Sequence, residues 1–230
     1  MTSNQTIRWI VKPVVFLAAL TPFAWLVWAV YTGHLSADPL ADITNETGVW
    51  TLRFLCITLL VTPVRRLTGW NAAMRFRRML GLFAFFYGTV HFLIFIVADR
   101  LASLGFPSLL AWQSVRALAM SIGTEIGKRP YITVGFTSWT CMLALASTST
   151  TGMVRRLGGK RWTALHRLVY LAVVAGVVHY WWLVKLDVRR PAIYAVVVGV
   201  LLGFRVWWSR KRPPPPVRAT GGRVAVPRSS

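Results

Sequence analysis

Six stretches of this sequence are long and apolar enough to cross a lipid bilayer, and they constrain the fold more than any other feature. A transmembrane helix needs about 20 mainly apolar residues to cross a hydrocarbon core about 30 Å thick. We predict spans at 10–31, 48–64, 79–98, 130–150, 164–186 and 191–208. The composition agrees, since 55% of the 230 residues are hydrophobic and only 14% are charged. The sequence therefore predicts an all-α integral membrane protein folded as a six-transmembrane-helix bundle.

The spans divide the chain into three parts. Residues 1–9 form a short N-terminal segment, 10–208 the membrane domain, and 209–230 a basic, proline-rich tail that we expect to be disordered. The connections between spans are short, so we expect no separate soluble catalytic domain. The longest connection, 99–129, has apolar residues at helical spacing and predicts an amphipathic helix on the membrane surface.

The net charge is strongly positive and unevenly distributed. Lys and Arg number 27 against six Asp and Glu, which gives a formal charge of +21. A soluble protein of this charge would suggest a nucleic-acid partner, but here the aromatic residues lie in apolar runs that lipid would cover, so we expect no nucleic acid. One set of connections carries most of the basic residues, and the opposite set carries all six acids. Because Lys and Arg stay on the cytoplasmic side during insertion, both termini are predicted to be cytoplasmic.

Two of the four histidines lie deep within apolar spans, where an ionisable side chain is costly. At 1.5 Å per residue, His91 lies about 18 Å beyond the start of the third span and His179 about 25 Å beyond the start of the fifth. Both therefore belong to the outer half of the membrane. Each has a glycine three residues earlier on the same helix face, Gly88 and Gly176, which would leave room for a flat macrocycle. Small residues also serve plain helix packing.

Two imidazoles facing each other across a helical bundle suit six-coordinate haem iron, which relays one electron at a time. Zinc fits less well, because a closed zinc site needs four ligands and neither histidine has a Cys, Asp or Glu within helical reach. We expect each ring to donate its other N–H to the carbonyl four residues back, that of Tyr87 or Ala175. The haem would then lie between the third and fifth spans.

The remaining candidates are less specific. His34 is expected to be a solvated turn residue, and His166 lies near the inner surface, at a depth that makes it a poor partner for His91. Arg53 is either a snorkelling side chain or a partner for a haem propionate. Basic residues that could bind a flavin phosphate or a propionate gather at the inner ends of the third and fifth spans. They are Arg75, Arg77, Arg78, Lys160, Arg161 and Arg167. The insertion rule alone would also place them there.

Two other functions compete with electron relay. One is a small membrane transporter or channel, although no acidic residue lies within the predicted core and no inverted repeat is detectable. The other is a membrane anchor for a partner enzyme, in which the histidines would be structural and replaceable.

Short motifs over nearly all of 15–208 resemble the MsrQ (YedZ) family of ferric-reductase-like membrane haem proteins. The matching stretches are 20–29, 37–39, 58–63, 77–82, 129–135, 146–150 and 159–162, continuing through 165–166 to 179–180. The resemblance implies haem b with His91 and His179 as axial ligands, and a bound FMN. His166 matches a family histidine that is either a second haem ligand or a residue near an inner flavin or quinone site, and we favour the latter. A purely structural role, with His166 at the membrane interface hydrogen-bonded to a loop carbonyl, is the alternative.

The resemblance also implies partners and a location. The electron donor would be the quinone pool or a cytoplasmic flavin reductase, and the chain would lie in the lipid bilayer of the cell inner membrane. Electrons would pass to MsrP, a periplasmic molybdopterin enzyme that repairs oxidised methionines. This chain would then be the electron-transfer subunit and not the subunit that reduces methionine sulfoxide.

Overall fold

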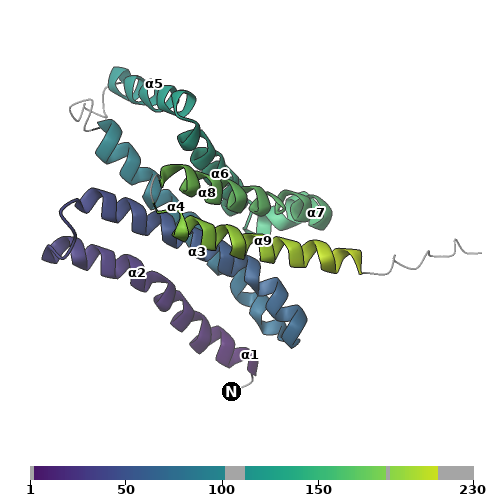
Figure 1. Ribbon diagram of the computed structural model, residues 1–230. Coiled ribbons are helices and arrows are strands. Elements are labelled where there is room, and N and C mark those ends of the chain that lie inside the picture. Colours follow the sequence, from purple (N-terminus) through teal and green to yellow (C-terminus); the bar gives the residue numbers. More distant parts are fainter. Residues whose placement is uncertain (1–2, 102–111, 185–186, 212–230) are drawn as a thin grey trace, which may run out of the picture.

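The computed structural model describes residues 3–101, 112–184 and 187–211, and within these ranges the chain is almost entirely helical, with no β-strand (Figure 1). The elements in chain order are α1 (Ser3–Thr6), η1 (Ile7–Val11), α2 (Lys12–Thr32), α3 (Pro39–Thr68), η2 (Asn71–Ala73), α4 (Met74–Ile94), η3 (Phe95–Leu101), α5 (Trp112–Lys128), α6 (Pro130–Ser147), α7 (Thr151–Leu165), α8 (Leu168–Leu183) and α9 (Arg189–Arg210). The all-α prediction is confirmed.

Fewer of the described helices meet the length and hydropathy of a membrane span than the six that the sequence suggested. Within the described ranges, four helical stretches are long and apolar enough to cross a membrane. They are Ile7–Thr32, Pro39–Thr68, Asn71–Ala98 and Arg189–Arg210. A fifth is added if α7 and α8, which meet at a 43° bend, form one broken span. The predicted count of six is not confirmed, because α6 has only 18 residues, several of them Thr or Ser.

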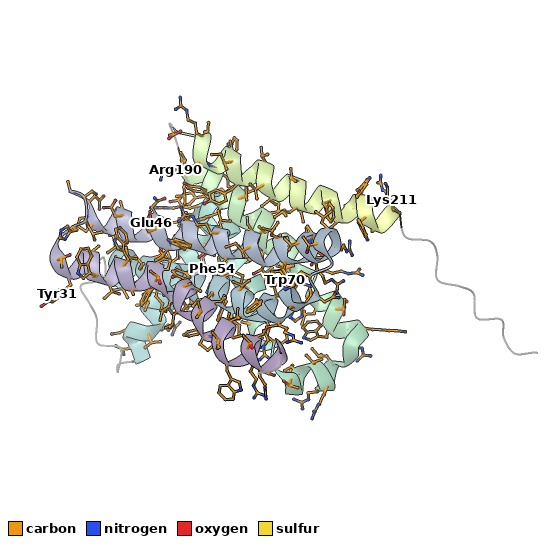
Figure 2. All side chains as sticks on the ribbon, turned by 90° about the horizontal axis from the view of Figure 1, so that it is seen from below. Tyr31, Glu46, Phe54, Trp70, Arg190 and Lys211 are labelled. Carbon is orange, nitrogen blue, oxygen red and sulfur yellow. The ribbon has the colours of Figure 1, made fainter. Side chains whose placement is uncertain are left out.

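The core is an antiparallel bundle of α3, α4, α6 and α8, in which α3 packs most extensively on α4 and α6 on α8. Two thirds of the apolar stretch of α3 is buried, against 17% for the stretch containing α2 and 11% for α9. The helix α3 is therefore central, whereas α2 lies along one edge (Figure 1). We call the end where α3 begins and α4 ends the Asp38 end, and the opposite end the Trp70 end. Figure 2 shows Tyr31 and Lys211 far apart, at these two ends.

Local signals fix where α3 begins. The Asp38 side chain caps the helix by accepting the Ala41 N–H at 3.0 Å, and Pro39 occupies the first helical turn. Asp42 accepts the Ser36 N–H at 2.7 Å, which closes the preceding turn. Gly33, with a φ of 70°, ends α2 in the left-handed conformation that glycine favours. These contacts set the register of α3.

Other predicted boundaries shift. The helix at the N-terminus begins at Ser3, inside the segment predicted for 1–9, and α9 continues to Arg210, past the predicted end at 208. Residues 212–230 of the predicted tail lie outside the described residues, as does the segment 102–111. The rest of the predicted surface helix is present as α5, which packs on α6 and η3 outside the bundle (Figure 1).

A buried tyrosine ties α2 to the core. Tyr87 on α4 is 1% exposed, and its hydroxyl donates to the Ala19 carbonyl at 2.9 Å and accepts the Phe23 N–H at 3.0 Å. Ala19 and Phe23 are four residues apart, so the hydroxyl bridges a carbonyl and an amide that would otherwise bond directly within α2. Pro22, next to Phe23, has no N–H and weakens the same turn. The hydroxyl therefore completes the hydrogen bonding of α2 at this point.

We predict that Tyr87→Phe destabilises the protein by about 1–3 kcal/mol, because it leaves a partly buried amide and a buried carbonyl without their bridge. The measurement is the midpoint of thermal unfolding in detergent. Tyr31→Phe is the control, since Tyr31 is 90% exposed. Equal midpoints for Tyr87→Phe and the unaltered chain would contradict this role of the hydroxyl.

Candidate functional site

The structure brings His91 of α4 and His179 of α8 together at the Asp38 end of the bundle. Their ring centroids are 6.1 Å apart and the ring planes are nearly perpendicular, at 85°. Both rings border the same cavity. No third His, Cys, Asp or Glu joins them into a metal-binding cluster within the described part of the chain.

One nitrogen of each ring is held by a backbone carbonyl from a neighbouring helix. The Nδ1 of His91 lies 3.0 Å from the carbonyl oxygen of Thr44 on α3, and the Nδ1 of His179 lies 2.7 Å from that of Tyr131 on α6. A carbonyl only accepts hydrogen bonds, so each Nδ1 carries the proton. The lone pair of each Nε2 is therefore available to a metal.

The prediction that the carbonyls of Tyr87 and Ala175 hold these rings is wrong. A carbonyl four residues back along the same helix already accepts a backbone N–H, and the His91 and His179 rings extend to neighbouring helices instead. Holding each ring from a second helix also links α3 to α4 and α6 to α8.

Four residues after each residue that provides a carbonyl, a glycine lies against the same histidine ring. A Cβ on Gly48 would lie 3.2 Å from Cε1 of His91, and a Cβ on Gly135 would lie 2.6 Å from Nδ1 of His179. Any larger residue at Gly135 would displace the imidazole. Neither glycine was predicted from the sequence, because the role of each one depends on a ring from a neighbouring helix that lies against it.

The two glycines chosen from sequence border the cavity but contact other side chains. A Cβ on Gly88 would lie 2.8 Å from Cε of Met142, and one on Gly176 would lie 3.0 Å from Cδ2 of Leu52. Gly88 and Gly176 therefore allow close packing beneath the cavity, and Gly48 and Gly135 allow the histidine rings themselves to fit.

The cavity has a volume of about 650 Å³ and lies between α3, α4, α6 and α8. This size is typical of pockets that bind cofactors. Its walls are mainly apolar, with Leu55, Phe92 and Phe136 among them, and its polar residues include Asp38 and Arg129. The arrangement suits a large, flat, apolar molecule with a few polar groups.

Three other sequence candidates lie away from the cavity walls as the structure describes them. The Arg53 guanidinium stacks over Trp50 at 4.4 Å, and its Nε donates to the Tyr194 hydroxyl at 3.2 Å. The exposed His34 contacts the Thr32 hydroxyl at 2.7 Å, as expected of a turn residue. The third, His166, lies where α7 ends.

The His166 ring lies against a tryptophan of the preceding helical turn. Its centroid is 3.8 Å from that of Trp162, and its Nδ1 lies 3.1 Å from the Trp162 carbonyl oxygen. Trp162 in turn donates from Nε1 to the Thr148 carbonyl at 3.0 Å, which joins the turn before α7 to the end of α7. His166 lies at the Trp70 end, so the structure does not bring it to the pair formed by His91 and His179.

Of the arginines predicted to line a cofactor site at the Trp70 end, only Arg77 is partly shielded from solvent. Arg77 is partly buried and lies within electrostatic range of Arg205 and His166. The other predicted arginines at this end are exposed. They are Arg75, Arg78, Arg161 and Arg167.

Arg205 is a functional candidate that was not predicted from the sequence. It lies within the apolar stretch of α9, and its Nη1 donates to the Tyr170 hydroxyl and its Nη2 to the Leu59 carbonyl, both at 2.8 Å. Its buried Nε has no hydrogen-bond partner among the described residues. A charged residue within a predicted span is a functional signal that the sequence does carry.

Comparison with known proteins agrees with this architecture. Residues 47–177 match the family model of the ferric reductase like transmembrane component. The chain is therefore a ferric-reductase-like transmembrane protein.

Closer relatives narrow the family. The chain is 51% identical over 200 residues to the MsrQ heme-binding subunit of protein-methionine-sulfoxide reductase from Ralstonia nicotianae, covering 86% of this chain and 85% of that protein. It is 46% identical to the MsrQ subunits of Herminiimonas arsenicoxydans, over 87% of this chain and 86% of the relative, and of Xanthomonas euvesicatoria pv. vesicatoria, over 89% and 93%. The chain belongs to the MsrQ family, as its motifs suggested.

Proposed function

We propose that this chain is a membrane b-type cytochrome in which His91 and His179 would hold one haem iron. The observation that carries the proposal is the pair of rings 6.1 Å apart, each with Nδ1 bound to a carbonyl. Two imidazoles that bind the same metal from opposite sides, each through a ring nitrogen about 2 Å away, would have centroids about 6 Å apart. The name of the relatives, heme-binding subunit, supports the same conclusion.

Haem held by these two imidazoles would supply one-electron transfer. The protein's own residues would orient the ligands and line the cavity. The carbonyls of Thr44 and Tyr131 fix the orientation of the rings, and apolar side chains such as Leu52 and Phe92 border the cavity.

The distribution of charge supports a direction for electron flow. Each acidic residue whose side chain the structure describes belongs to the Asp38 end, and arginines gather at the Trp70 end. By the positive-inside rule, the Trp70 end and both termini face the cytoplasm. The histidine pair then lies in the periplasmic half of the inner membrane, close to a periplasmic molybdopterin reductase of the MsrP type. The role of this chain would be to supply electrons that support repair of oxidised periplasmic proteins.

A donor site at the cytoplasmic face completes the proposed path. Arg77 and Arg205 come from α4 and α9, and Tyr170 from α8 presents its hydroxyl beside them. Guanidinium groups suit the phosphate of FMN or the carbonyl oxygens of a quinone. His166, within electrostatic range of Arg77, would border this site and would not bind the haem described above. The donor would be the quinone pool or a cytoplasmic flavin reductase.

The spectrum of the purified protein tests the haem assignment. The unaltered chain is expected to show a Soret band and sharp α and β bands on reduction, and His91→Ala or His179→Ala is expected to abolish the low-spin spectrum. His34→Ala, at an exposed position, is the control and should retain it. His166→Ala should also retain it.

A colourless protein would instead favour the two competing functions, a small transporter or a structural anchor. Loss of half the haem in His166→Ala would show that His166 binds a second haem and would contradict our placement of this residue.

The close approach of Gly135 to His179 gives a second prediction. Gly135→Ala should lose most of the low-spin haem, because the added methyl group would lie 2.6 Å from Nδ1. Gly199→Ala on α9 is the matched control, since a Cβ there would have no described atom within 4 Å apart from the adjoining backbone of its own helix. Alanine is otherwise favourable in helices, so loss of haem confined to Gly135→Ala is steric in origin. Full haem content in Gly135→Ala would contradict the ring position.

The inner site is tested by flavin content. Arg205→Gln is expected to lower the FMN bound per polypeptide by at least about tenfold, because a charge-assisted contact is lost, while haem content stays unchanged. Arg210→Gln, an exposed change on the same helix, should alter neither cofactor. Unchanged FMN content in Arg205→Gln, or no FMN in the unaltered chain, would contradict the assignment.

A further inference from the structure

The rim of the cavity carries a basic residue at a position that the proposed haem would require. Haem b bears two carboxylate side chains on one edge of its ring. A carboxylate removed from water without a partner is costly, so a haem site commonly supplies a cation or hydrogen-bond donors where that edge emerges. Among the described residues that border the cavity, Arg129 is the only Arg or Lys.

Arg129 lies where α6 begins. It is the N-cap residue of that helix, and its side chain is 49% exposed, so the guanidinium is at the mouth of the cavity and not in its interior. Tyr131, two residues later, provides the carbonyl that holds His179. One short segment therefore borders the cavity with a guanidinium and fixes a proposed iron ligand.

Two neighbours hold the Arg129 guanidinium in place. Its Nε lies 2.7 Å from Oε2 of Glu125, and its Nη1 donates to the Tyr131 hydroxyl at 3.1 Å. Glu125 belongs to α5, so the surface helix fixes the arginine relative to the bundle. A guanidinium has five N–H donors in a planar fork, so it can bind a carboxylate while it keeps other partners.

The other charged residues near this end do not offer the same contact. Arg53 does not border the cavity, and its guanidinium lies over Trp50 and donates to the Tyr194 hydroxyl. Asp38, the only acid among the described cavity residues, would repel a carboxylate, and it already accepts the Ala41 N–H. The favourable position for an anionic edge is therefore beside Arg129.

We propose that Arg129 binds a propionate carboxylate of the haem and so fixes the orientation of the macrocycle in the cavity. This inference rests on the proposed function, since it concerns the same cofactor. It assigns to Arg129 the propionate contact that the sequence suggested for Arg53.

The test compares two porphyrins in the full-length chain. Apoprotein in detergent is titrated with haem b and with its dimethyl ester, in which both carboxylates are blocked, and affinity is read from the Soret band. We expect Arg129→Gln to bind haem b about 10- to 100-fold more weakly than the unaltered chain, as expected for loss of a charge-assisted pair. Both proteins should bind the dimethyl ester equally. Lys128→Gln, an exposed neighbour that does not border the cavity, is the matched control and should bind both porphyrins as the unaltered chain does.

The outcomes separate this inference from the proposed function. Equal weakening for both porphyrins would show that Arg129 acts only on folding, and unchanged affinity for haem b would show that it makes no contact. If Arg53→Gln weakened the binding of haem b but not of its dimethyl ester, and Arg129→Gln changed neither affinity, the propionate contact would belong to Arg53. Each of these results would overturn the inference while leaving the cytochrome assignment intact. If the unaltered chain binds neither porphyrin, the proposed function fails, and this inference fails with it.

Discussion

The structure depends on how an apolar helical bundle provides hydrogen-bond partners for the ring nitrogens of two histidines. Inside a membrane no water is available to a ring nitrogen, so each one needs a partner from the protein or a cofactor. The carbonyls of Thr44 and Tyr131 satisfy Nδ1 of His91 and His179. These bonds join α3 to α4 and α6 to α8, the two most extensively packed helix pairs in the bundle. The same two hydrogen bonds therefore connect the packed helix pairs and hold the histidine rings in position.

The sequence predicted the parts of this arrangement that follow from helix geometry. The rise per residue was enough to place His91 and His179 at similar depth and to separate them from His166. It could not show which neighbouring helix would face each ring. The carbonyl partners predicted within the same helix were therefore wrong, and Gly48 and Gly135 were missed, because their role depends on contacts between helices.

The predicted spans and charges show the same limit. Hydropathy located α9 but left Arg205 within an apolar run, and only the folded chain shows it beside Tyr170 and the Leu59 carbonyl. The predicted fifth span became α8 preceded by a bend, since the chain turns between α7 and α8. Average hydropathy locates helices in a bilayer, but it does not report which polar atoms meet inside them.

Electron paramagnetic resonance of the oxidised protein at low temperature tests most directly whether both rings bind one iron. Two imidazoles on opposite sides of ferric haem give a low-spin signal, and planes near 85° apart should make that signal strongly anisotropic. A predominantly high-spin signal, typical of iron with a single protein ligand, would contradict ligation by both histidines.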